Sequence, residues 1–477
     1  MKREPGGMLA GEGKKKIGGL EGRRRRNIRI LMSLATVLVL AAAGTTIVVM
    51  QRGTATAAQD VAAESPEPSL ITATPQVAPL SSDAPMPSPQ ALAAALAPVV
   101  TNPALGTFSG SVADALTGNV LWSQDPDTPM TPASTTKILT AAAAMLALPA
   151  DHRVETRVVQ GTKPGEIVLV GDGDPTLTAQ PAGAPGYYPG GPRIADLVEQ
   201  IQRAGTPVDS IVVDTGAYTG PTMAQGWMPE DVAAGYIAPT ESLMIDGGRI
   251  TPLADESPRS PTPALDAGRV LAQALGIDPA RVVLGKAEAG AAPVASVLSA
   301  PLRDRLGQMM RKSDNVLAEA IAREVAGAKN AERSFAGATA AVSQTMYDAG
   351  FKMDGLVLHD GSGLSVDNRI PARLLTETLT AAAGDTKPQL RPMLDDLPVA
   401  GATGTLSDRY ASGDRTGAGW VRAKTGTLSV ASVLTGYVVD VDGRVLTFAL
   451  MSNNSPPEVS RPALDAVAGT LRLCGCR

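Results

Sequence analysis

Cysteine and histidine are scarce in this sequence, and their scarcity removes several kinds of site. The two cysteines, Cys474 and Cys476, both lie at the C-terminal end, so no disulfide framework joins distant parts of the chain. They form either a strained local disulfide or two free thiols. The two histidines, His152 and His359, are too few for a zinc site without carboxylate ligands, and a Ser-His-Asp triad would have to use one of them.

Aromatic residues are also rare, at 3% of the 477 residues, but apolar residues reach 44%, which is enough to form a core. The length favours two or more domains. Residues 1–29 hold ten basic and three acidic residues, and the rest of the chain holds 32 basic and 44 acidic residues, a net charge of −12. So acidic a body argues against nucleic acid as a partner.

Charge is absent from residues 30–50, a run of 21 residues that would span about 31 Å as a helix. This segment is expected to be a transmembrane anchor, and the basic residues 1–29 before it are expected to be a cytoplasmic tail. The alternative is a cleaved signal peptide, with Ala55-Thr56-Ala57 as the cleavage site. Both interpretations place the body of the protein outside the cytoplasm. Residues 51–89, which contain seven prolines, are predicted to be a disordered linker.

The folded body has two parts that differ in their predicted secondary structure. Alternating patterns around turns predict a β-hairpin and an antiparallel meander, with helices before and after, which is an α+β arrangement. The strands are predicted at 108–114, 119–123, 420–426, 431–439 and 445–452, with a further strand at 355–359 and a short helix at 388–394. Residues 161–285 have strands and a helix of their own and are predicted to be an inserted domain, which divides the main domain into 90–160 and 286–477.

The clearest candidate for chemistry is Ser134 with Lys137. Residues 138–148 are apolar on every side and predict a central buried helix, so Ser134 lies in its first turn, beside free backbone N–H groups. Lys137 follows one turn later on the same face. A neutral lysine can take the proton of a serine hydroxyl, and burial or a second cation favours the neutral form. The alternative is a helix cap followed by a solvated lysine.

Two further short motifs follow Ser134-x-x-Lys137 along the chain. Ser313-x-Asn315 alone is typical of a helix cap, and Lys424-Thr425-Gly426 alone is typical of an exposed strand end. Together and in this order, the three motifs resemble those of the serine penicillin-recognising family, which comprises penicillin-binding proteins and serine β-lactamases. The separation of 179 positions from Ser134 to Ser313 narrows the resemblance to the low-molecular-mass, class C D-alanyl-D-alanine carboxypeptidases, the dacB-like or S13 peptidases, which carry an inserted domain there.

Further patches of sequence resemble the same family. They are residues 171–177, 360–365, 397–401 and 404–406. The resemblance covers residues 90–475. It implies a transpeptidase fold like that of penicillin-binding proteins and serine β-lactamases, in which an antiparallel sheet has helices on both faces.

The resemblance also implies roles for the residues of the first two motifs. Ser134 would attack the carbonyl of a D-Ala–D-Ala peptide bond while Lys137 takes its proton, and the products would form through an acyl-enzyme. Ser313 would relay the proton to the leaving amine. Asn315 would hold the substrate amide and Lys137. No metal or cofactor is required.

The third motif is implied to bind the end of the substrate. Lys424 and Thr425 would contact the terminal carboxylate, and the charge of Lys424 would help to keep Lys137 neutral. The backbone N–H groups of Ser134 and Thr427 would form the oxyanion hole. The substrates would be peptidoglycan stem peptides, with β-lactams as inhibitors.

One position departs from the family pattern. A basic residue often follows the motif at 360–365, where it reads the charged end of the donor peptide, but here the residue is Val366. Trp227, Glu230 and Tyr236 either line that subsite or belong to the core of the insertion.

The expected activity is a serine-type D-alanyl-D-alanine carboxypeptidase, with endopeptidase activity on cross-links as an extension. A β-lactamase would need fast deacylation, and no Glu-containing motif for it is visible at a suitable spacing. A catalytically silent scaffold would not need all three motifs intact.

Overall fold

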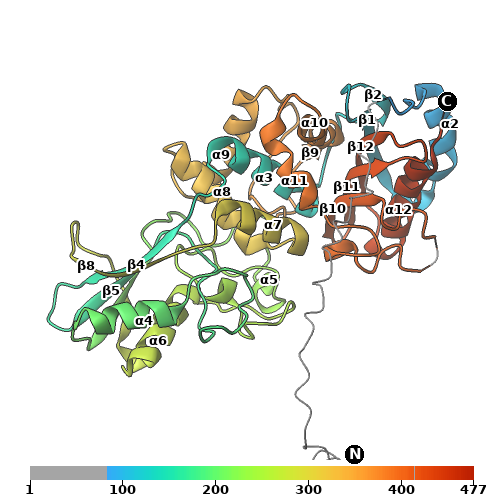
Figure 1. Ribbon diagram of the computed structural model, residues 1–477. Coiled ribbons are helices and arrows are strands. Elements are labelled where there is room, and N and C mark those ends of the chain that lie inside the picture. Colours follow the sequence, from blue (N-terminus) through green and yellow to red (C-terminus); the bar gives the residue numbers. More distant parts are fainter. Residues whose placement is uncertain (1–82, 413, 477) are drawn as a thin grey trace, which may run out of the picture. The chain divides into compact units, whose positions relative to one another are not determined.

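The computed structural model describes residues 83–412 and 414–476 (Figure 1). The expected cytoplasmic tail, the apolar segment 30–50 and most of the linker 51–89 lie outside the described residues. Among those described, no helix combines the length and apolar character needed to span a membrane. The last linker residues pair with the C-terminal end of the chain, because the backbone N–H of Ser88 donates to the carbonyl of Cys476 at 2.6 Å. Cys474 and Cys476 are bonded to each other.

The main sheet has five strands in the order β10-β11-β12-β1-β2, and every neighbouring pair is antiparallel. The hairpin and the meander predicted from the sequence are both present. The strands are β1 (Thr107–Asp114), β2 (Val120–Gln124), β10 (Val421–Leu428), β11 (Ala431–Val439) and β12 (Val445–Asn453).

Helices cover both faces of this sheet. Because side chains alternate between faces along a strand, Leu434 and Phe448 pack on one face and Val433 and Ala449 on the other. The first face is covered by α2 (Pro89–Val100) and α12 (Pro457–Leu473). The second is covered by a helical layer made of α3 (Thr136–Ala147), α7 (Leu302–Lys312), α8 (Asn315–Ala328), α9 (Phe335–Asp348) and α10 (Ala372–Ala383). The predicted α+β fold is therefore confirmed.

The helix α3 lies in the middle of the helical layer. Its residues from Thr136 to Ala144 are all buried, as its apolar composition predicts. A tight turn, the 3-10 helix Ala133–Thr135, precedes it, so Ser134 lies in this turn, before α3 begins at Thr136.

A second five-stranded sheet forms the core of the insertion, with the order β7-β6-β5-β4-β8. Its strands are β4 (Glu155–Gln160), β5 (Glu166–Gly171), β6 (Ser210–Asp214), β7 (Val282–Leu284) and β8 (Pro293–Leu298). The helices α4 (Ile194–Arg203) and α6 (Pro263–Leu275) pack on it. Because β4 and β8 pair with each other, the insertion, defined here as residues 155–298, extends beyond the expected range 161–285.

Two predicted elements take a different form. Residues 355–359 do not form a strand, because only Val357 pairs as in a sheet, in an isolated bridge with Arg369. The short helix expected at 388–394 is divided into the 3-10 helix Pro388–Leu390 and α11 (Pro392–Asp395). Pro392 has no backbone N–H to continue the first turn. The remaining short elements are β3 (Pro129–Met130), β9 (Ile370–Pro371) and α5 (Glu230–Ala233).

Candidate active site

The turn that carries Ser134 is held in an unusual backbone conformation. Ala133 has a φ of 47°, in the left-handed region that residues with a Cβ seldom adopt. Two glycines pack against it. A Cβ on Gly363 would collide with the carbonyl oxygen of Ala133, and one on Gly426 would lie 2.6 Å from that of Pro132. The turn is therefore packed tightly between strand β10 and the loop of residues 360–365, called here the Asp360 loop.

Lys137 lies directly behind Ser134 and is fully buried. Its Nζ atom lies 3.0 Å from Ser134 Oγ, 2.6 Å from Asn315 Oδ1 and 2.6 Å from the carbonyl oxygen of Ser362. The contacts with Asn315 and Ser362 fix the amine in place. The contact with Ser134 puts it within hydrogen-bonding distance of the hydroxyl group that it would deprotonate.

Burial lowers the pKa of Lys137 to about 8, although the carboxylates of Asp360, Asp314 and Glu319 act in the opposite direction. A substantial fraction of the amine is therefore neutral near physiological pH. The charge of Lys424 was expected to help keep Lys137 neutral, but burial is what lowers the pKa of Lys137. The repulsion between the two amines adds to burial in holding the pKa of Lys424 well below its usual value.

The second motif lies at the junction of two helices. Ser313 ends α7 with a left-handed φ of 57°, and Asp314 caps α8 by accepting from the backbone N–H of Leu317 at 3.0 Å. Asn315 is the first residue of α8. Its Oδ1 accepts from Lys137, and its Nδ2 donates to the carbonyl of Tyr236 in the insertion at 3.0 Å. The insertion therefore orients the amide of this motif.

The third motif lies on β10, an edge strand of the main sheet. Lys424 is fully buried, and its Nζ donates to Ser313 Oγ at 2.8 Å and to the carbonyl of Thr425 at 2.9 Å. The hydroxyls of Thr425 and Thr405 lie 2.7 Å apart. Lys424 thus joins the second motif to the third, as Lys137 joins the first to the second.

The seven residues for which the sequence implies a catalytic or substrate-binding role all lie at one cleft of about 860 Å³. Five of them line it: Ser134, Ser313, Asn315, Thr425 and Thr427. The two lysines lie beneath the lining, each bonded to it. No histidine is among the lining residues. The arrangement places a hydroxyl, a buried amine with a lowered pKa, and a second amine-hydroxyl pair around one space, which suits acyl transfer to serine.

The sequence model of the D-Ala-D-Ala carboxypeptidase 3 (S13) family matches residues 92–260 and 254–472, most of the chain. The chain belongs to the D-Ala-D-Ala carboxypeptidase 3 (S13) family. The resemblance inferred from the three motifs is thereby confirmed. D-Ala-D-Ala carboxypeptidase activity through a serine acyl-enzyme, which the sequence predicts, is general for the S13 family.

Relatives of this S13 chain extend over nearly its whole length. A carboxypeptidase of Mycobacterium tuberculosis is 52% identical over 87% of this chain and 91% of its own. Carboxypeptidase DacB of Mycolicibacterium smegmatis is 49% identical over 95% of this chain and 99% of its own. Penicillin binding protein 4 (dacB) of Haemophilus influenzae shares the fold, with a TM-score of 0.62 at 21% identity, over 80% of this chain and all of the solved one.

The S13 site also includes residues that sequence reasoning passed over. Glu319 on α8 is fully buried and accepts from the backbone N–H groups of Gly361 and Ser362 at 3.0 and 2.8 Å, which fixes the carbonyl that holds Lys137. Burial and the nearby Asp360 raise the pKa of Glu319 to about 7, against the effect of Arg323. Only the resemblance of residues 360–365 pointed here, and it gave no role to Glu319.

The structure distinguishes between the residues whose role the sequence left undecided. Trp227 is buried, and its Nε1 donates to Asp360 Oδ2 at 2.7 Å, so it supports the Asp360 loop. Tyr236 lines the cleft, whereas Glu230 and Val366 are not among the lining residues. His152 pairs with Glu324 at 3.3 Å on the far end of α8.

Proposed function

We propose that Ser134 is the acyl-accepting nucleophile of this S13 peptidase and that Lys137 is its general base. The observation that carries the proposal is the 3.0 Å contact between Lys137 Nζ and Ser134 Oγ, made by an amine whose burial lowers its pKa to about 8. With the amine neutral, the hydroxyl proton passes to Nζ as Oγ bonds to the carbonyl carbon.

The backbone N–H groups of Ser134 and Thr427 form the oxyanion hole in this proposal. Strand β10 runs close beside the nucleophile, because a Cβ on Gly426 would lie 3.3 Å from Ser134 N. Both residues line the cleft. Losing one such donor typically lowers the rate by about 10²–10³-fold.

The second and third motifs handle the leaving group and the end of the substrate. Ser313 passes the proton to the departing amine, which its 2.8 Å bond to Lys424 supports. Asn315 holds the substrate amide while keeping Lys137 in place. Lys424 and Thr425 bind the free carboxylate of the residue that leaves. A carboxylate ligand suits this place, because its negative charge favours the protonated form of Lys424.

The substrate in this proposal is the D-Ala–D-Ala end of a peptidoglycan stem peptide. Attack forms an ester between Ser134 and the penultimate D-Ala, the C–N bond breaks, and the terminal D-Ala leaves with the proton. Water then hydrolyses the ester. β-lactams acylate the same serine. The same steps cleave a cross-link when the leaving amine belongs to a second stem peptide.

The test is D-Ala release from a cell-wall pentapeptide. The unaltered enzyme should release D-Ala, and Ser134→Ala should abolish release. Ser412→Ala, at an exposed serine outside the cleft, should leave it unchanged. D-Ala release that survives in Ser134→Ala would show that the nucleophile is assigned wrongly.

We also propose that the catalytic body works outside the cytoplasm, held to the membrane through residues 30–50. The uncharged 21-residue run and the basic segment before it support this. The full chain labelled with a fluorescent penicillin should sediment with membranes and resist extraction by high salt. Recovery in the culture medium without residues 30–50 would favour the cleaved signal peptide instead.

A further inference from the structure

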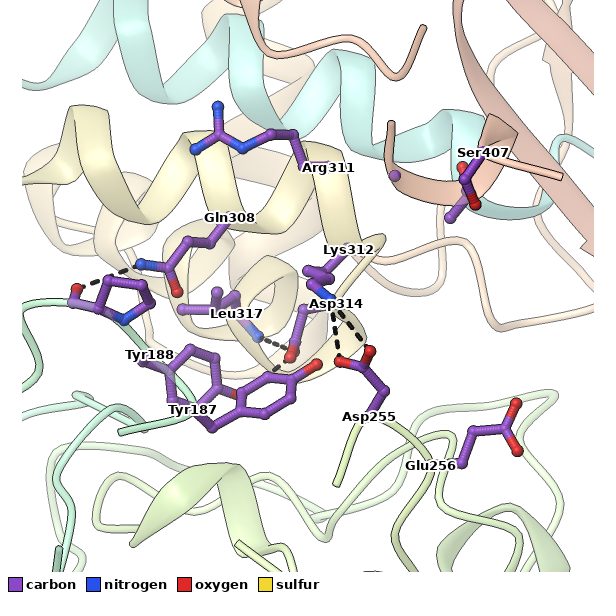
Figure 2. A pocket seen from close by; sticks show the side chains of 13 residues that line it. Tyr187, Tyr188, Asp255, Glu256, Gln308, Arg311, Lys312, Asp314, Leu317 and Ser407 are labelled. Carbon is purple, nitrogen blue, oxygen red and sulfur yellow. Dashed lines mark hydrogen bonds and ion pairs between the residues drawn. The ribbon is translucent and has the colours of Figure 1, made fainter. Parts of the chain in front are cut away.

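A second cavity of about 650 Å³ opens beside the catalytic cleft. Its walls come from both halves of the molecule. Tyr187 to Pro189 and Asp255 to Glu256 belong to the insertion, whereas the end of α7 and residues 404–407 belong to the main domain (Figure 2). Glu256, Lys312 and Thr405 line both spaces, so the cavity continues the cleft.

The junction between the two spaces lies at the leaving-group side of the reaction. Thr405 is hydrogen-bonded to Thr425 at 2.7 Å, and Lys312 directly precedes Ser313, which Lys424 holds at 2.8 Å. These are the residues that the proposed function assigns to the free carboxylate and to the leaving amine. A terminal D-Ala ends at this point. A leaving residue that carries a longer chain would extend into the second cavity.

Packing and polar contacts hold the insertion side of the cavity in place. The guanidinium of Arg249 stacks 3.4 Å from the centre of the Tyr187 ring and forms a buried ion pair with Asp314 at 3.2 Å. Gln308 on α7 donates to the carbonyl of Pro189 at 3.2 Å, across the boundary between insertion and main domain. The wall is therefore formed before a ligand arrives, which lowers the entropic cost of binding.

The chemistry of the lining suits a peptide chain. Tyr187 offers an aromatic face, while Gln308, Ser407 and Thr405 offer donors and acceptors for backbone amides. Arg311 and Lys312 also line the cavity, half-exposed and in ion pairs with Asp396 and Asp255. The volume lies within the range of about 300–1,000 Å³ that is usual for ligand sites.

We propose that this cavity binds the second stem peptide of a cross-linked substrate and thereby selects for endopeptidase cleavage. The inference rests on the proposed function, because it needs the leaving group to depart past Ser313. No new chemistry is involved. The amide between the two stems breaks, Ser134 keeps the acyl part, and the second stem leaves as the amine and takes the proton. D-Ala release from a single stem does not use the cavity.

The experiment compares two activities of one enzyme: D-Ala release from a monomeric pentapeptide and cleavage of a purified cross-linked dimer. Ser407→Trp fills the cavity from an exposed position without removing a contact, and Tyr187→Ala removes its aromatic wall. Each variant should lower kcat/KM for the dimer by about tenfold or more, which corresponds to about 1.4 kcal/mol. D-Ala release and the rate of penicillin acylation should change by less than about twofold.

Matched controls separate the cavity from general effects of substitution. Ser412→Trp and Tyr347→Ala alter exposed residues of the same types outside both cavities and should leave both activities unchanged. A Ser407→Trp enzyme that cleaves the dimer at the normal rate, or loses both activities equally, overturns the inference. An unaltered enzyme that releases D-Ala but does not cleave the dimer also overturns it, and one that does neither overturns the proposed function.

Discussion

Lys137 is the residue on which the proposed chemistry depends most. The sequence predicts its place one turn after Ser134, and the resemblance implies its contact with Asn315. The structure adds a second acceptor for its amine, the carbonyl of Ser362. The spacing of Ser134 and Lys137 is local, so a helical pattern suffices to predict it. The part played by Ser362 and Glu319 depends on contacts between residues far apart in the chain, which a single sequence does not reveal.

The pH dependence of acylation tests the state of this amine. Since only neutral Lys137 accepts a proton, and burial lowers its pKa to about 8, acylation should rise with pH and level off above about 8. Below that value the rate should rise by about tenfold per pH unit. The measurement is the second-order rate of benzylpenicillin acylation across the pH range in which the fold is intact. A profile that is flat through pH 8 would contradict a lysine base.

At the scale of elements, the first two motifs lie where elements meet, before α3 and between α7 and α8, and the third lies within the edge strand β10. The strands and helices of the main sheet could be predicted because their patterns are regular. The strand predicted at 355–359 is wrong because its short apolar run suggests a strand, although only Val357 pairs in a bridge. The left-handed residues Ala133 and Ser313 carry no local signal, since neither is glycine or asparagine.

The Asp360 loop provides the prediction at this scale. Gly363 has a φ of +84°, and a Cβ there would collide with the carbonyl of Ala133 and lie 2.7 Å from Thr136 Oγ1. Gly363→Ala should therefore displace the turn of Ser134 and slow penicillin acylation by more than about tenfold. The matched control is Gly183→Ala, which has a φ of +79° but open space around its Cβ. Acylation of Gly363→Ala at the normal rate would show that the loop does not set the turn.

At the scale of the whole molecule, the insertion is connected to the main domain by the chain and also contacts the catalytic residues and their neighbours. Asn315 donates to Tyr236, Trp227 supports Asp360, and Arg249 pairs with Asp314 in a fully buried bridge. The sequence indicated an insertion because residues 161–285 have predicted strands and a helix of their own. Its contacts with the site depend on tertiary packing and could not be predicted.

The buried pair of Arg249 and Asp314 gives the prediction at this scale. Burial opposes ionisation of Asp314, but Arg249 and Arg259 hold its pKa below the usual value. Arg249→Met leaves this carboxylate without its partner and should lower the free energy of unfolding by about 3–5 kcal/mol. Chemical denaturation measures the change. Arg269→Met, which breaks a half-exposed pair with Asp266, should cost less than about 1 kcal/mol. Equal losses in the two variants would contradict the account.

The most direct test of the central claim is the mass of the protein after treatment with benzylpenicillin, followed by mapping of the modified peptide. The account predicts one penicilloyl group, attached at Ser134 and absent from Ser134→Ala, while Ser412→Ala is labelled like the unaltered chain. An adduct that persists in Ser134→Ala, or that maps to another residue, would contradict it.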